Sequence, residues 1–202
     1  MCALATADIK RATMDKTIKI GDQEYRINTD KSKGQGCFVE ILRATESNLT
    51  AMLSYHCKVL VVQFVVHCYE YEPKNHGVSD LMRVVKKRLS SKYRRCRVAG
   101  GWVRETGKSG IQHYHVALFI DGNKVRWNSG IQDLINEILD TRNYPRSSFS
   151  PSHMVHRDDE DGLRKAFYHL SYLAKTRSKW ARLPSTNDYS FSRIRPKMCA
   201  IF

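Results

Sequence analysis

The sequence predicts an α+β fold in which an antiparallel sheet carries its helices on one face and leaves the other face open. Three observations predict this fold. The elements follow one another in the order β-α-β-β-α-β, the middle two strands flank a short Gly-rich turn, and 42% of the 202 residues are hydrophobic, which is enough for one core. This order of elements is that of the ferredoxin-like, split βαβ arrangement.

The first half of the core is expected from a β-branched run and an amphipathic helix. The run at 59–69 predicts a central strand, and the pattern at 79–93 predicts a helix with Ser79 as its N-cap. Strands at 97–105 and 112–121 flank the turn at 106–110, so they are expected to pair as a hairpin.

The second half of the core is expected from two further helical patterns. Apolar residues at helical spacing predict helices at 130–141 and 161–177, with a short strand at 152–157 between them. The core domain is therefore assigned to residues 58–180, followed by a C-terminal tail at 181–202. Residues 1–57 are expected to form an appendage, an N-terminal extension made of a hairpin at 17–28 and a helix at 38–55.

The charge of the chain indicates a polyanionic partner. Lys and Arg number 34 against 20 Asp and Glu, a formal net charge of +14 with a pI near 9.6, which is typical of a nucleic-acid-binding domain. No apolar stretch is long enough to span a membrane and no secretory signal precedes the domain, so a cytoplasmic location is expected. The six cysteines form no C-x-x-C pair, which argues against a zinc ribbon.

Clusters of basic residues are the candidate contacts to the nucleic-acid backbone. Most of them lie on the helix at 79–93 and around the helix at 161–177, and a solvated helix face explains the first cluster equally well. The candidates are Arg83, Lys86, Lys87, Lys92, Arg94, Lys165 and Lys179.

Two histidines on one strand are the first candidate for chemistry. Strand alternation places His113 and His115 on the open face, two residues apart, where both imidazoles can reach one cation. Glu105 faces them across the hairpin and is the candidate third ligand, although a solvated edge-strand glutamate explains it as well. Gln63 and His67 are the reserve ligands.

Two tyrosines on the last helix are the second candidate. At about 100° per residue, Tyr168, Tyr172 and Lys175 fall within roughly 60° of one another, away from the apolar stripe of the helix. Since other residues fill the core positions, these tyrosines are expected to be exposed and to act in chemistry.

These residues carry a resemblance to a known family. The segment QHYHVALF at 112–119 resembles the His-hydrophobic-His motif of the HUH endonucleases, and the tyrosine helix is similar to their Y-x-x-K and Y-x-x-x-Y-x-x-K motifs. Over about 58–179 the chain looks most like the rolling-circle replication initiators of filamentous phages and prophages. The resemblance implies an HUH core with one or two active tyrosines, and Tyr172 is the first choice.

The resemblance implies a metal-dependent reaction on single-stranded origin DNA. His113, His115 and Glu105 would hold Mn²⁺ or Mg²⁺, and Tyr172 would attack as its phenolate to form a 5'-phosphotyrosyl link and release a 3'-hydroxyl. Lys175 would favour the phenolate, so its removal is expected to slow cleavage. The turn at 107–109 lacks the spacing of a phosphate-binding P-loop, so unwinding is expected to need a host helicase.

Other functions use similar parts. An HUH transposase or a plasmid relaxase has the same chemistry, and a non-catalytic RRM-like module has the same topology and charge. The histidines on the open face, where an RRM carries aromatic platforms, favour the nuclease. His153 and His156 are interpreted as ordinary surface residues.

Overall fold

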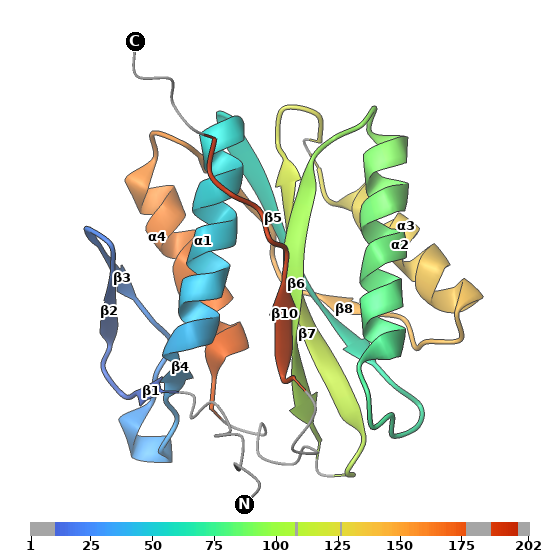
Figure 1. Cartoon of the computed structure of the whole chain (residues 1–202), viewed down its shortest axis with the longest axis horizontal. Helices are drawn as coiled ribbons and strands as arrows, with labels where there is room; N and C mark the ends of the chain where they lie inside the picture. Colours follow the sequence, from blue (N-terminus) through green and yellow to red (C-terminus); the bar gives the residue numbers. More distant parts are fainter. Residues whose placement is uncertain (1–10, 108, 126, 177–186, 198–202) are drawn as a thin grey trace, which may run out of the picture.

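One antiparallel sheet separates two pairs of helices in the computed structural model, which describes residues 11–107, 109–125, 127–176 and 187–197. In Figure 1, α2 and α3 lie on one side of the sheet, and α1 and α4 lie on the other. The chain is therefore α+β, as the sequence predicts.

Three long strands form the middle of the sheet. The central strand β7 (Gln112–Asp121) pairs with β5 (Lys58–His67) on one side and β6 (Val98–Thr106) on the other, both antiparallel. Short strands extend both edges. They are β8 (Ser148–Phe149) and β9 (His153–His156), which pair with β5, and β10 (Tyr189–Phe191), which pairs with β6. The three predicted long strands are confirmed to within two residues.

The first face of the sheet is covered by α2 (His76–Lys92) and α3 (Ser129–Thr141). Leu81, Leu89 and Ile135 are fully buried in one apolar cluster with the sheet residues that point to this side. The helix α2 begins at His76, three residues before the predicted N-cap Ser79, and Asn75 takes the N-cap position, although its side chain bonds to residues outside the helix and not to the helix N-terminus.

The second face is not open, which corrects the expectation of an uncovered face, whereas the two core helices α2 and α3 do share the first face. Helices α1 (Val39–Tyr55) and α4 (Glu160–Leu170) cover it, and the fully buried Leu42 and Phe167 belong to the same apolar cluster as Val61 and Phe119. The reason is that β5 and β7 carry apolar side chains on both faces, and the apolar part of the second face must also be removed from water.

The N-terminal segment is part of the core. The hairpin predicted at 17–28 is present as β2 (Thr17–Ile20) and β3 (Gln23–Arg26), and a short 3-10 turn, η1 (Lys31–Lys33), and a small pair, β1 (Ala12–Thr13) and β4 (Cys37–Phe38), lead into α1. The ring of Tyr25 lies 4.3 Å from that of Phe167 on α4. The domain boundary at residue 57 stays a prediction, but α1 is not an appendage.

The tyrosine helix is shorter than the sequence predicts. It ends at Leu170 and continues as a 3-10 turn, η2 (Ser171–Ala174), after which Lys175 adopts an extended conformation. The Ser171 hydroxyl donates to the Tyr168 carbonyl at 2.6 Å, a local hydrogen bond that competes with the helical pattern. In the described part of the chain, no helix combines the length and the hydropathy needed to cross a membrane.

Candidate metal and tyrosine site

The sheet register brings the two histidines and the glutamate together. His113 on β7 lies directly opposite Glu105 on β6 and opposite His67 on β5. His115 lies two positions further along the same face, opposite Val103. Because side chains alternate along a strand, Glu105, His113 and His115 all project from the face that α1 and α4 partly cover.

The three side chains could hold a metal ion. The Glu105 Oε2 atom lies 3.7 Å from Nε2 of His113 and 3.5 Å from Nε2 of His115, and one ligand atom from each residue lies within 4.8 Å of the others. Adjacent ligands of an octahedral ion with bonds of about 2.1 Å are roughly 3 Å apart, so small rotations of these side chains suffice. Two imidazoles and a carboxylate suit Mn²⁺ better than Mg²⁺, because nitrogen donors favour the transition metal.

The reserve ligands have different positions. The ring of His67 is stacked on His113 with centroids 5.7 Å apart, but His67 lies outside the group of three. Burial and the neighbouring histidines lower the pKa of His67. Gln63 pairs with Ala117, two residues beyond His115 on β7, so it lies along the sheet from the metal group.

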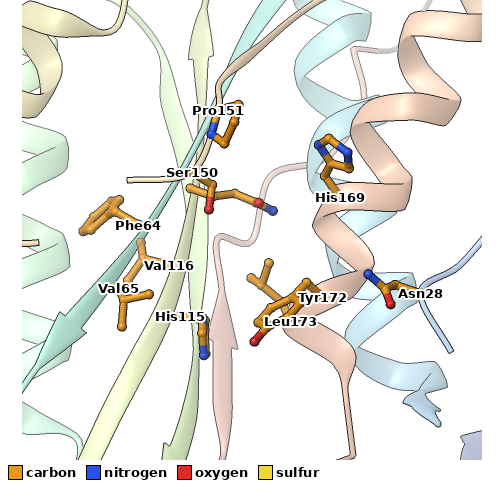
Figure 2. Close-up of a pocket in the computed structure, with 11 residues that line it drawn as sticks. Asn28, Phe64, Val65, His115, Val116, Ser150, Pro151, His169, Tyr172 and Leu173 are labelled. Carbon is orange, nitrogen blue, oxygen red and sulfur yellow. The ribbon is translucent and has the colours of Figure 1, made fainter. Parts of the chain in front are cut away.

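Tyr172 lies against the histidines. Its ring centroid is 5.3 Å from that of His115 in an edge-on arrangement, and the Lys175 Nζ atom lies 4.1 Å from the centroid of the Tyr172 ring. Figure 2 shows the tyrosine side chain extending from the end of α4 toward His115 on β7. The residue is 43% exposed, so solvent and a ligand can reach its side chain.

The N-terminal segment holds the turn that carries Tyr172. The Asn28 backbone N–H donates to the Ser171 hydroxyl at 2.9 Å, and the Thr176 N–H donates to the Gly36 carbonyl at 3.0 Å. Lys175 forms a β-bridge with Cys37 between these two bonds. The turn is therefore positioned by residues 138 to 143 positions earlier in the chain, and the sequence pattern of the turn gives no sign of these contacts.

Tyr168 is not at the same place as Tyr172. It lies on α4, where the guanidinium of Arg26 is 5.5 Å from its ring centroid. The expected clustering of Tyr168, Tyr172 and Lys175 on one helical side depended on a helix continuing to 177. Since α4 ends at Leu170, Tyr172 contacts His115 and Lys175, whereas Tyr168 contacts Arg26.

A cavity of about 360 Å³ adjoins Tyr172 and His115. Its described lining includes Gln63, which the sequence analysis placed near the histidines, and also Asn28, Ser150 and His169, which the sequence pattern did not assign to this place. His169 shares a 2.7 Å hydrogen bond with His153 on β9, so His153 is not an isolated surface residue. Only Gln63 carried a signal in the sequence, because it is the polar residue on the histidine side of a strand that is otherwise apolar.

The predicted DNA contacts lie in two separate places. Helix α2, with Arg83, Lys87 and Lys92, covers the face of the sheet opposite the histidines. Lys86 is partly buried and bonds within the protein: its ammonium donates to the Ser192 hydroxyl at 2.8 Å, and burial lowers its pKa.

The remaining candidates differ in position. The ammonium of Lys92 donates to the Gly130 carbonyl at 3.0 Å, and Arg94 follows α2 with a positive φ of 51°. Lys165 is exposed on α4, the helix that leads to Tyr172, and Lys179 lies outside the described residues. Of the described candidates, Lys165 is therefore the one on the same face as the histidines.

Comparisons of this chain with protein-family models, with curated proteins and with solved structures found no match.

Proposed function

We propose that the chain is a metal-dependent endonuclease of the HUH type, which nicks and rejoins single-stranded DNA through Tyr172. The observation that carries the proposal is the contact between two independent groups. The Tyr172 ring lies 5.3 Å from His115, and His115 belongs to the one cluster of metal-ligating side chains found among the described residues. A phosphate between them could touch both.

The residues of this site account for a transesterification. The Tyr172 oxygen attacks the phosphorus, a bond forms between them, and the bond from phosphorus to the 3'-oxygen breaks. The phenol proton passes to water, the 3'-oxygen takes up a proton from water and leaves as a hydroxyl, and the 5'-phosphate stays on the tyrosine. Because the reaction exchanges one phosphate ester for another, attack by a 3'-hydroxyl reverses it and rejoins the strand.

The side chains around Tyr172 are placed to stabilise the negative charge that this reaction involves. The Lys175 ammonium, 4.1 Å from the ring centroid, stabilises negative charge that develops on the phenol oxygen. His113, His115 and Glu105 would hold the ion, which when bound polarises the phosphate and offsets its charge. The apolar packing around Leu173 and Phe167, both almost fully buried, keeps the turn in a fixed place.

The fold supports the same proposal. With β9, the strand order is β9-β5-β7-β6, and α2 and α3 lie on one face. This is the order of a ferredoxin-like, split βαβ core, in which β7 is a central strand. The chain order of the histidine strand before the tyrosine turn suits a replication initiator, so we assign the DNA as a rolling-circle origin of a phage or prophage.

The partners follow from the reaction. A tyrosine attack on one strand needs that strand unpaired, and a net charge of +14 favours binding to its phosphates. We therefore propose single-stranded DNA as the substrate and a host helicase as the source of unwound strand.

A covalent-adduct assay tests the proposal. Purified protein is incubated with labelled single-stranded oligonucleotides of mixed sequence and MnCl₂, and the products are separated on a denaturing gel. We expect a protein–DNA adduct that chelator prevents, with the modified peptide identified by mass spectrometry as the one that contains Tyr172.

Matched tyrosine variants decide the assignment. Tyr172→Phe removes the nucleophile and leaves a folded protein, since Tyr172 is partly exposed. Tyr168→Phe makes the same change four residues earlier and is expected to keep the adduct. An adduct that persists in Tyr172→Phe at the wild-type level, or none with the wild type on any oligonucleotide, would overturn the proposal.

A further inference from the structure

We infer that the cavity beside Tyr172 is a nucleobase pocket, which takes one unpaired base of single-stranded DNA next to the phosphate that Tyr172 attacks. The inference rests on the proposed function for the identity of the strand, and on the cavity itself for the kind of group it binds. Tyr172 and His115 both line the cavity, so a nucleotide held at these two residues has the cavity within reach of its base.

The lining of the cavity is suited to a neutral group. The described residues that line it include no Lys, Arg, Asp or Glu, although the chain as a whole is strongly basic. A phosphate or a carboxylate in this space would have no full opposite charge to pair with, and burying an unpaired charge is costly. A neutral ring with polar edges meets no such penalty.

The cavity is lined by both polar and apolar residues. Val65, Pro151 and Leu173 contribute apolar surface that suits the faces of a flat ring, and Ser150, His169 and Asn28 contribute groups that suit its edge. The volume of about 360 Å³ lies within the usual range of small-molecule pockets, roughly 300 to 1,000 Å³. Figure 2 shows Ser150 and Pro151 on the side of the sheet and His169 on the side of α4.

Gln63 is the residue that we assign to reading the base. Its side-chain nitrogen is buried and has no hydrogen-bond partner among the described residues, and Gln63 lines the cavity. A buried amide without a partner is unfavourable in the free protein and is satisfied when a ligand supplies an acceptor. Base edges supply such acceptors, as ring nitrogens or carbonyl oxygens.

The neighbourhood holds Gln63 in place. Its backbone carbonyl accepts a hydrogen bond from the Ser150 N–H at 3.0 Å, which ties the segment after β8 to β5 on one side of the cavity. On the other side, the 2.7 Å bond between His153 and His169 ties α4 to β9. Both walls are therefore fixed before a base arrives, so its binding has a small ordering cost.

Binding measurements without cleavage test the pocket. The Tyr172→Phe protein is titrated in EDTA against fluorescent 12-mers of dT, dC and dA and against an abasic 12-mer, with fluorescence anisotropy as the readout. We expect Gln63→Leu in this background to lose about fivefold or more in affinity for the best homopolymer and nothing for the abasic strand, as removal of one base-edge hydrogen bond predicts.

Two further variants sharpen the test. Gln132→Leu makes the same change on α3, across the sheet from the cavity, and is expected to bind every strand as the parent does. Gln63→Glu keeps the shape of the side chain but replaces the hydrogen-bond donor with an acceptor. Its affinity for the best homopolymer is therefore expected to fall as that of Gln63→Leu does.

Each outcome has a defined meaning. Unchanged affinity of Gln63→Leu for all strands, or an equal loss for homopolymers and the abasic strand, would overturn the pocket. Tighter binding of a uridine RNA 12-mer than of dT 12-mer would overturn the assignment to DNA. If no covalent adduct forms with the wild type while the base-dependent loss persists, the nuclease proposal fails and the pocket stands.

Discussion

The three-residue metal group makes a prediction about stability that does not depend on any DNA. A ligand that binds only the folded protein stabilises it, so Mn²⁺ is expected to raise the free energy of unfolding if Glu105, His113 and His115 hold it. The perturbation is Glu105→Gln, which keeps the size of the side chain and removes its negative charge. Glu105 is only 8% exposed and contacts both histidines, so it is the ligand whose loss the ion cannot replace from solvent.

The expected magnitude follows from linkage. At a Mn²⁺ concentration of about 100 times Kd, the stabilisation is about 2.7 kcal/mol. For a domain of this size, 1 kcal/mol corresponds to roughly 2 to 4 °C, so the melting temperature should rise by about 5 to 11 °C. Loss of a residue that only hydrogen-bonds to a metal ligand lowers metal affinity by up to about a hundredfold, and loss of a ligand should lower it at least as much. With a hundredfold loss, the stabilisation at the same Mn²⁺ concentration falls to about 0.4 kcal/mol, or about 1 °C.

The assay is thermal unfolding followed by circular dichroism, with Mn²⁺ and with EDTA. Glu24→Gln is the control, because Glu24 is an exposed carboxylate on β3, and it should respond to Mn²⁺ as the wild type does. In EDTA the Glu105→Gln protein must still unfold cooperatively. An equal Mn²⁺ shift in Glu105→Gln and the wild type would refute the metal group, and so would no shift in either protein.

Three further predictions concern neighbouring residues. Lys175→Ala should slow adduct formation on the order of a hundredfold between pH 7 and 9, while Lys175→Arg retains most of the rate, because the cation stabilises charge on the attacking oxygen; equal rates for Lys175→Ala and the wild type would contradict this role. Gln63→Leu should raise the free energy of unfolding in urea by about 1 kcal/mol, because it removes a buried donor without a partner among the described residues; a loss of stability would show that the amide is satisfied in solution. Burial and the neighbouring His169 lower the pKa of His153, so the unfolded chain binds the proton more readily. The stability linked to His153 is therefore complete above the unfolded pKa of about 6.5 and is lost as the pH falls through it toward the folded value, and His153→Gln should flatten the fall in urea midpoint between pH 7.5 and 5.

Much of the site could be predicted because it depends on local rules. Strand alternation puts His113 and His115 on one face whatever surrounds the sheet, and a short turn after β6 makes Glu105 the residue opposite His113. These are contacts between neighbours in one hairpin, about ten residues apart. Periodicity predicted the long strands and most of the helices for the same reason, since it records which side of each element must be buried.

What the pattern could not supply was the arrangement of distant segments. Helical spacing placed Tyr168, Tyr172 and Lys175 together, but α4 ends at Leu170, where the Ser171 hydroxyl bonds to the Tyr168 carbonyl and to the Asn28 N–H from the N-terminal segment. The same limitation explains the covered second face. The pattern of α1 shows that it has an apolar side but not which surface that side meets.

The sequence alone thus determined the residue types and the hairpin register. It specified a histidine pair, a carboxylate opposite it, an excess of basic residues and the order of the elements along the chain. The meeting of Tyr172 with His115, and the cavity between α4 and the sheet, were decided by tertiary packing between segments distant in the chain. Burial of apolar area is not directional, so it favours many pairings of the same faces. Only the complete set of contacts selects the one in which these side chains meet.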